Sequence, residues 1–97
     1  MRHEIILAPE AVEDLRRLSA RARAEVVDAL ETHLRHEPTK TSRSRIKRLR
    51  GLSRPQYRLR VSEVRVFYDV DAGRVEILAI VMKSDSAAWL AGEGRKS

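Results

Sequence analysis

Three arginines, Arg58, Arg60 and Arg65, alternate with apolar residues in a stretch that reads as two short β-strands, 57–61 and 64–70. A guanidinium group keeps its positive charge and can bind two phosphate oxygens at once, so three of them on one face would hold a phosphate. The same permanent protonation makes arginine a poor proton acceptor. The three arginines therefore predict a polyanionic ligand, and an acid–base reaction at this place would need a further residue.

Side-chain alternation also sets the register of these two strands. The apolar residues of both strands point to one face, and a two-residue turn then places Arg60 opposite Arg65 and Arg58 opposite Phe67. Like charges directly opposite each other destabilise a sheet by up to roughly 1 kcal/mol. A shift of one residue would remove the repulsion but would turn the arginines into the core, which costs more. Either a bound anion relieves the repulsion, or the long side chains spread into water.

Lys83 is a further basic residue that the strand pattern places near these arginines. Residues 74–83 are apolar on both faces and predict a central third strand, joined to the second by a three-residue turn at 71–73. This spacing puts Lys83 on the same face as Arg65, where neighbouring positive charges favour the neutral amine that can accept a proton. The alternative is that Lys83 ends the strand and extends its ammonium group into water.

The composition restricts the class of protein. The chain has 97 residues and a net charge of +6 with a pI near 10.5, which favours a polyanionic partner such as nucleic acid or an acidic protein segment. It has no cysteine, which excludes disulfides, thiol nucleophiles and cysteine-based zinc sites. No segment approaches the ~18 apolar residues of a membrane-spanning helix, and we expect a cytoplasmic protein. We expect one domain over residues 1–91 and a flexible tail at 92–97.

The positive charge is concentrated in residues 39–65, which contain ten lysines and arginines and one acidic residue. The first part of this segment, 39–50, is polar, and we expect a loop there with Ile46 and Leu49 as apolar anchors. Its cations are expected to contact RNA phosphate without sequence preference: Lys40, Arg43, Arg45, Lys47, Arg48 and Arg50. The alternative is a solvated, charged loop.

The remaining segments predict an α+β fold. Residues 3–8 form a short strand, Pro9 begins a first helix, and Ser19 caps a second one. A short helix follows the third strand of the meander, with Ser84 or Asp85 as its cap. We expect a small antiparallel sheet, made of the N-terminal strand and the three-stranded meander, packed against the N-terminal helical hairpin, with a short C-terminal helix.

The aromatic side chains have expected places in this fold. Tyr57, Tyr68 and Trp89 are predicted to lie in the core, where each tyrosine hydroxyl needs a hydrogen-bond partner. Phe67 falls on the arginine face, lying across from Arg58. It can stack there on a nucleobase, or it can be covered by the closing helix.

Two histidines, His33 and His36, lie one helical turn apart beside Glu37, a spacing that could bind a metal ion. The same pair suits the end of a helix, where positive side chains interact favourably with the helix dipole. We expect this second role, and therefore no metal site and no cofactor.

Four motifs carry a resemblance to a known family: RLRGL (48–52), YRLRV (57–61), RVFYDV (65–70) and GRVEILAIVMK (73–83). With the order strand, two helices, basic loop, meander and short helix, the chain resembles the RelE/ParE family of toxins from bacterial toxin–antitoxin modules over nearly its whole length. The resemblance implies a toxin that is neutralised by a cognate antitoxin, which wraps an extended segment around it.

RelE-type members of this family cut mRNA in the ribosomal decoding site, without a metal ion, by attack of a ribose 2′-OH on the adjacent phosphate. The resemblance carries the catalytic role over to four basic residues: Arg58, Arg60, Arg65 and Lys83. The first two are often lysines in RelE-type nucleases, and the fourth basic position aligns with Ser84, next to Lys83. The tyrosine that acts as acid or base in the last helix has no equivalent here.

Two alternatives to a nuclease stay open. ParE-type members share the fold and inhibit DNA gyrase without cutting RNA, and the missing tyrosine and the arginine-for-lysine pattern favour this alternative. The other is a chain that is not toxic and binds the antitoxin or nucleic acid. Our first hypothesis is a RelE-like, ribosome-dependent mRNA endonuclease that inhibits translation, with ribosome and mRNA as partners and a toxin–antitoxin hetero-oligomer as its neutralised state.

Overall fold

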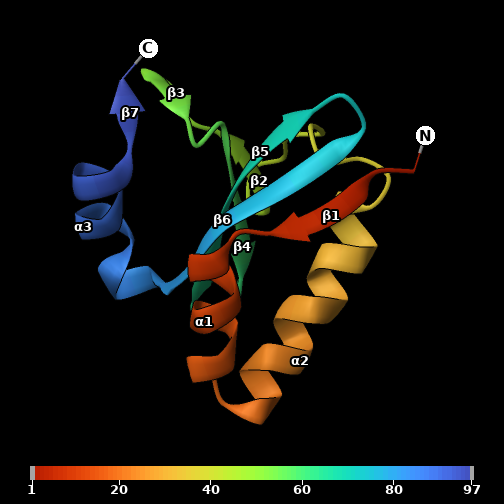
Figure 1. Ribbon diagram of the computed structural model, residues 1–97, viewed down its shortest axis with the longest axis vertical. Helices are drawn as coiled ribbons and strands as arrows, with labels where there is room; N and C mark the ends of the chain where they lie inside the picture. Colours follow the sequence, from red (N-terminus) through yellow and green to blue (C-terminus); the bar gives the residue numbers. More distant parts are fainter. Residues whose placement is uncertain (1, 97) are drawn as a thin grey trace.

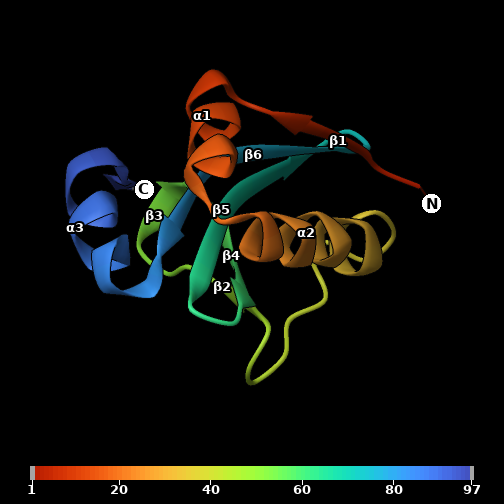
Figure 2. The same cartoon turned by 90° about the horizontal axis from the view of Figure 1, so that it is seen from below.

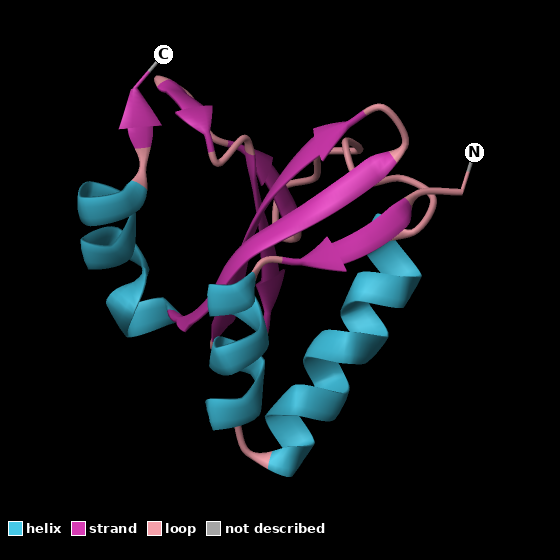
Figure 3. Cartoon of the chain, viewed as in Figure 1, coloured by secondary structure: helices cyan, strands magenta, loops and turns pink. Residues whose placement is uncertain are grey.

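The computed structural model describes residues 2–96 and has the α+β architecture that the sequence predicts (Figure 1). The elements are β1 (Glu4–Leu7), α1 (Pro9–Arg17), α2 (Ala20–Ala29) with a π-helical turn η1 (Leu30–Leu34), β2 (Ile46–Arg48), β3 (Leu52–Arg54), β4 (Tyr57–Val61), β5 (Val64–Asp71), β6 (Arg74–Met82), α3 (Lys83–Glu93) and β7 (Arg95–Lys96). Five strands form the central sheet in the order β1-β6-β5-β4-β2. The helices α1 and α2 make a hairpin on one side, and α3 lies apart from them (Figures 2 and 3).

The two N-terminal helices begin where the sequence predicts. α1 begins at Pro9, and the Ser19 hydroxyl caps α2 by accepting a hydrogen bond from the Ala22 amide (3.1 Å). The guanidinium of Arg23 donates hydrogen bonds to carbonyls around the end of α1, those of Leu15 (3.2 Å), Arg16 (3.0 Å) and Leu18 (3.0 Å). Carbonyls at a helix end lack some of the partners that they have within the helix, so Arg23 supplies donors there and joins the two helices.

The core lies between the helical hairpin and one face of the sheet. Its fully buried members come from both layers: Ala11, Val26, Leu34, Leu59, Val66, Tyr68, Val75 and Ile77. The Tyr68 hydroxyl donates a hydrogen bond to the Pro38 carbonyl (2.6 Å), and its ring stacks on Tyr57 with 5.5 Å between ring centroids. Burial, and to a lesser extent Tyr57, raises the pKa of Tyr68, so the hydroxyl stays a donor. The structural role expected for Tyr68 is confirmed.

The connection between β5 and β6 differs from the prediction of a three-residue turn at 71–73. Only Ala72 and Gly73 lie in the turn, and both have a left-handed backbone (φ 45° and 80°). This conformation is typical of the two-residue turns that match the twist of paired strands. A bulge near the middle of the β5–β6 pairing shifts the register by one further residue. The shorter turn and the bulge each shift the pairing by one residue. Because side chains alternate between faces, a total shift of two residues leaves Lys83 on the predicted face.

Two strands correct the prediction of an antiparallel sheet with a loop at 39–50. β1 lies parallel to β6, and the expected loop contains β2, which pairs with β4 and buries Ile46 beside Leu59. The alternation within a short strand reveals neither its direction nor its partner, and a strand of three residues is too short for a periodic pattern. The sheet is therefore mixed and has one strand more than expected.

The C-terminal part differs as well. α3 begins at Lys83, directly after β6, and has no side-chain cap, whereas the sequence predicts Ser84 or Asp85 in that role. In the segment 92–97, expected as a flexible tail, residues 95 and 96 form β7, which pairs with β3 in a small second sheet, while Ser97 lies outside the described residues. This pairing joins residues that are about forty positions apart, so no local sequence pattern predicts it.

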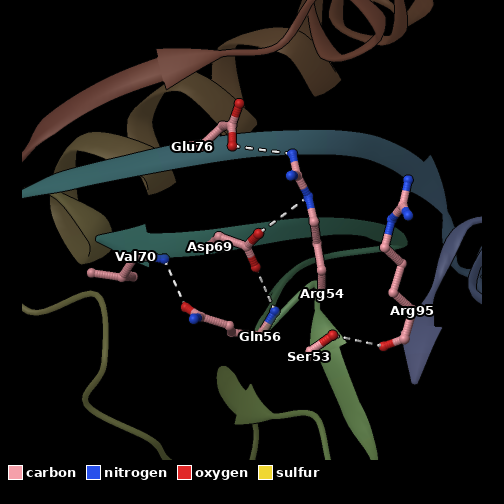
Figure 4. A network of polar contacts seen from close by, with 7 residues as sticks. All are labelled: Ser53, Arg54, Gln56, Asp69, Val70, Glu76 and Arg95. Carbon is pink, nitrogen blue, oxygen red and sulfur yellow. Dashed lines mark hydrogen bonds and ion pairs between the residues drawn. The ribbon is translucent and has the colours of Figure 1, made fainter. Parts of the chain in front are cut away.

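A polar network ties β3 to the central sheet (Figure 4). Arg54 forms ion pairs with Asp69 (3.4 Å) and Glu76 (3.2 Å), and the Asp69 carboxylate accepts a hydrogen bond from the Gln56 amide (2.7 Å). The side-chain carbonyl of Gln56 accepts one from the Val70 amide (2.8 Å). Burial raises the pKa of Asp69 against the opposing effects of the Gln56 amide and Arg54. The network anchors β3 and, through strand pairing, β7 and the end of α3.

Asp14 joins α1 to the sheet. β1 ends at Leu7, opposite Ile77, so the following part of β6 has no strand neighbour on that side. There the Asp14 carboxylate accepts a hydrogen bond from the Ile80 amide (2.9 Å), and its side chain is only 19% exposed. One carboxylate thus supplies the acceptor that a strand would otherwise offer.

His33 lies half-buried near the end of the helical hairpin, in a cavity of about 260 Å³ that Arg45 and His36 also line. Burial lowers the pKa of His33, and the charge of Arg45 lowers it further, against the attraction of Asp28. The folded protein therefore favours the neutral form of this histidine.

We predict that Asp14→Ala lowers the free energy of unfolding by about 1–3 kcal/mol, because the partly buried Ile80 amide loses its acceptor. Urea unfolding followed by circular dichroism measures this loss. Glu13→Ala is the matched control: Glu13 pairs with Arg16 on the exposed side of the same helix, and its removal should cost less than about 0.5 kcal/mol. Equal losses in the two variants would contradict the role given to Asp14.

We predict that stability falls as the pH decreases from about 6.5, the ordinary pKa of histidine, through the lower pKa of folded His33. The unfolded chain binds the proton more readily in this window, whereas above it the contribution of His33 is complete. Thermal unfolding between pH 5 and 8 measures the effect. His33→Gln should weaken the pH dependence and His36→Gln, at an exposed position, should not; an unchanged profile in His33→Gln would refute the prediction.

Candidate nucleic-acid interface

Four basic side chains lie on the sheet face that points away from α1 and α2. In the register of β2, β4 and β5, Lys47 pairs with Arg58, and Arg60 pairs with Arg65. The residues that alternate with them point to the other face, into the core. The register predicted for the three arginines is confirmed, and Lys47 joins them from the edge strand. We call Lys47, Arg58, Arg60 and Arg65 the basic face.

The basic face has no carboxylate partner in the part of the chain that the structure describes. Within residues 2–96, none of its four side chains forms an ion pair with an aspartate or glutamate. Arg58 is half-buried, and its Nε atom is buried without a hydrogen-bond partner. Burial lowers the pKa of Arg58, and the charges of Arg65 and Arg60 lower it further. The positive charge of Arg58 is thus unfavourable in the free protein. An anion bound here would be attracted by cations that no carboxylate of the described residues neutralises.

The three arginines differ in their exposure. Arg60 is exposed and Arg58 is half-buried, whereas only 6% of Arg65 is exposed. The Nη1 group of Arg65 donates hydrogen bonds to the carbonyls of Ser62 (2.8 Å) and Val64 (3.0 Å) at the β4–β5 turn. Arg65 is therefore buried and hydrogen-bonded to backbone carbonyls, whereas Arg58 and Arg60 are more exposed.

Lys83, the candidate proton acceptor, is the exposed first residue of α3. Val81, two positions earlier, pairs with Arg65, so the alternation along β6 leads to the predicted face. The Lys83 amide donates a hydrogen bond to the Glu63 carbonyl in the β4–β5 turn (2.6 Å). The start of α3 is thus held beside one end of the basic face, and a role of Lys83 as a base stays a prediction.

Phe67 is not available to a nucleobase in this conformation. Its ring is completely buried, and Trp89 of α3 stacks on it with 4.8 Å between ring centroids and an interplanar angle of 11°. The sequence leaves two roles open for Phe67, and in the structure the closing helix covers its ring. The assignment of Phe67 to nucleic-acid binding is therefore corrected. Trp89, expected in the core, is half-buried, because it covers the sheet from outside.

Arg48 is exposed and also makes contacts within the fold, and its expected contact with RNA stays a prediction. Its guanidinium lies over the Tyr57 ring, 5.3 Å from the ring centroid, and donates hydrogen bonds to the carbonyls of Leu49 (3.2 Å) and Gln56 (2.7 Å). Alternation along β2 explains the difference from Lys47, because neighbouring residues of a strand point to opposite faces. Of the two neighbours, only Lys47 belongs to the basic face.

The other cations of the basic segment have varied surroundings. Lys40 forms an ion pair with Glu37 (3.5 Å), and Arg45 lines the cavity at the end of the helical hairpin. Arg43 and Arg50 are exposed. Contact of these four residues with RNA stays a prediction.

A cavity of about 350 Å³ lies between α1, β3 and α3, and the sequence does not indicate it. Pro9, Pro55, Leu78 and Trp89 form much of its apolar lining. They come from α1, the segment between β3 and β4, β6 and α3, and no local pattern marks all four as neighbours. α3 adds Trp89 to this lining.

The residues that the structure describes contain no group of three or more His, Asp or Glu side chains arranged as a metal site. His33 and His36 lie near Glu37 without forming one. No helix in residues 2–96 has the length and apolar character needed to cross a bilayer.

Comparison with known proteins identifies the family. The model of the family described as ParE toxin of the type II toxin–antitoxin system parDE matches residues 5–86. No curated protein sequence matches the chain.

Among solved structures, the chain is similar to the toxin–antitoxin complex RelBE2 from Mycobacterium tuberculosis, with 25% identity and a TM-score of 0.65 over 84% of this chain and 99% of that one. It is also similar to the archaeal RelE–RelB complex from Pyrococcus horikoshii OT3, with 21% identity and a TM-score of 0.70 over 86% and 97% of the chains. For the YoeB dimer from Staphylococcus aureus the values are 21% and 0.63, over 84% and 97%.

The family match extends from β1 to the first turn of α3 and includes all four residues of the basic face. The structural matches cover the same architecture. The chain therefore belongs to the RelE/ParE family and is a toxin of a type II toxin–antitoxin system.

Proposed function

We propose that this toxin inhibits translation by cutting mRNA on the ribosome, as a RelE-like endonuclease. The observation that carries the proposal is the basic face, where four cations meet and no carboxylate of residues 2–96 pairs with them. An RNA phosphate at this place is attracted by every one of the four charges. RNA is also the polyanion on which RelE-type members of the family act.

The proposed reaction is the attack of a ribose 2′-OH on the adjacent phosphorus. A bond forms between O2′ and phosphorus, and the bond from phosphorus to the 5′ oxygen of the next nucleotide breaks, which leaves a 2′,3′-cyclic phosphate and a 5′-hydroxyl. Guanidinium charge at the basic face stabilises the negative charge that develops on the phosphorane. Lys83 takes the proton of the 2′-OH, and the leaving 5′ oxygen takes a proton from water.

Inhibition of DNA gyrase is the second candidate function, and an observation at α3 favours it. RelE-type nucleases often have a tyrosine in this helix, whereas here Trp89 stacks on Phe67 and α3 has no tyrosine. In this case the basic face binds carboxylates of a protein partner and catalyses nothing.

The partner expected in the cell is a cognate antitoxin, because the similar solved structures include toxin–antitoxin complexes. An antitoxin segment that covers the basic face with acidic or apolar residues would neutralise the toxin by occupying the RNA site. We place the toxin in the cytoplasm, where ribosomes, mRNA and gyrase are found.

Mapping of new 5′ ends tests the proposed function. Purified toxin is added to ribosomes that translate a defined mRNA, with naked mRNA as control, and we expect cuts in the translated message alone. Lys83→Arg should lower the cleavage rate by about 10²–10⁴-fold, because a guanidinium does not accept the proton. Full activity of this variant would refute the base assignment. Absence of cuts by the wild-type toxin would favour gyrase, which a supercoiling assay then tests.

Sulfate should stabilise the free toxin by binding to the basic face. Because Arg60 and Arg65 face each other, Arg60→Gln should raise the melting temperature without sulfate and reduce the further rise that sulfate causes. Arg16→Gln is the matched control: it removes an exposed arginine of α1 that pairs with Glu13 (3.3 Å), and it should keep the full sulfate response. Thermal unfolding at constant ionic strength measures both effects. A wild-type sulfate response in Arg60→Gln would count against an anion site.

A further inference from the structure

Arg65 differs from the other members of the basic face in what its side chain touches. It is almost fully buried, and its Nη1 group is hydrogen-bonded to the Ser62 and Val64 carbonyls. A buried guanidinium that faces backbone carbonyls has little surface left for a phosphate. Arg60, its direct partner in the register, is exposed. Two arginines that look equivalent in the sequence thus have different surroundings.

The turn that Arg65 holds connects three elements. Ser62 has a left-handed backbone (φ 53°), which is uncommon for a residue other than glycine. Its hydroxyl donates a hydrogen bond to the Glu25 carboxylate of α2 (3.0 Å), and the Glu63 carbonyl accepts one from the Lys83 amide (2.6 Å). Arg65 fixes the carbonyls on both sides of Glu63, and Glu63 fixes the first residue of α3.

Lys47 has a side chain that is free to bind a phosphate, whereas Arg65 does not. It pairs with Arg58, so it lies beside this arginine on the basic face, and its side chain is exposed. β2 is the outermost strand of the sheet, and Lys47 therefore flanks β4 on the side opposite to Arg65. A single-stranded polyanion can reach this edge freely.

We propose that Lys47, Arg58 and Arg60 form the phosphate-binding set of this toxin, and that Arg65 is a positioning residue for the β4–β5 turn and the start of α3. The assignment rests on the proposed function, in which the basic face binds RNA. Arg65 then acts on the reaction through the placement of Lys83, while its charge adds to the field without touching the ligand.

The salt dependence of RNA binding separates the two roles. Affinity for a fluorescent single-stranded RNA oligonucleotide is measured over a range of salt concentrations, and each lost phosphate contact lowers the slope of log Kd against log salt by about 0.7. Lys47→Gln and Arg60→Gln should show this decrease. Arg65→Met should keep the wild-type slope, as should the control Arg16→Gln. A slope lowered by about 0.7 in Arg65→Met, or unchanged in Lys47→Gln, overturns the assignment.

Arg65→Lys provides the test if Arg65→Met does not fold. It keeps the positive charge, but the lysine nitrogen is one bond nearer to Cα than Nη1 of arginine and does not reach the two carbonyls in the same way. We expect faster hydrogen exchange at the Lys83 amide, measured by NMR well below the melting temperature, together with an unchanged salt slope. An exchange rate equal to that of the wild type overturns the positioning role.

Cleavage kinetics give a readout that loss of stability alone would not produce. Arg65→Lys should lower kcat by about tenfold or more with little change in KM, because the RNA contacts are kept and Lys83 is misplaced. Arg60→Gln should raise KM. A raised KM with unchanged kcat in Arg65→Lys contradicts the proposal.

The outcomes distinguish this inference from the proposed function. If the wild-type toxin binds RNA but cuts no translated message, the endonuclease function fails, and the salt slopes and exchange rates still decide between Arg65 and Lys47. If it does not bind RNA even at low salt, the phosphate-binding set is overturned together with the function.

Discussion

The alternation of side chains along β4 and β5 is the constraint on which the rest of this structure depends. One set of positions fills the core against α1 and α2, and the other set gathers positive charge on the opposite face. Full burial of one large apolar side chain contributes roughly 1.5–3 kcal/mol. Two like charges directly opposite each other cost up to roughly 1 kcal/mol. The core therefore keeps Arg60 opposite Arg65, because a slip of one residue, which would separate them, would also expose the apolar side chains.

In the proposed function, this balance places the cations of the anion site before the anion binds. The cations of the basic face stand on paired strands, so less conformational freedom is lost when a ligand binds. The Nε atom of half-buried Arg58 is one of the buried polar atoms that have no hydrogen-bond partner within the described residues. The same charge would attract an acidic antitoxin segment or an RNA, and under the proposed function the two would compete for one surface.

The C-terminal helix shows how far a short element can depend on its surroundings. α3 has no buried residue and no side-chain cap. It is held at its start by the Glu63–Lys83 hydrogen bond, in its middle by the stacking of Trp89 on Phe67, and at its end by the pairing of β7 with β3. β3 is in turn anchored by the Arg54 network (Figure 4). The place of Lys83 is thus decided by the β4–β5 turn more than by the helix that begins with it.

The sequence by itself determined the α+β class, the helical hairpin, the β4–β5 register and the family, because alternation, caps and motifs are local patterns that a chain carries in any environment. Only the tertiary structure decided that β1 is parallel to β6, that β2 joins the sheet, and that β7 pairs with β3. It also decided that Phe67 is covered and that Arg65 is buried while Arg60 is exposed. Strand partners and burial depend on which distant segments meet, and a local pattern contains no information about them.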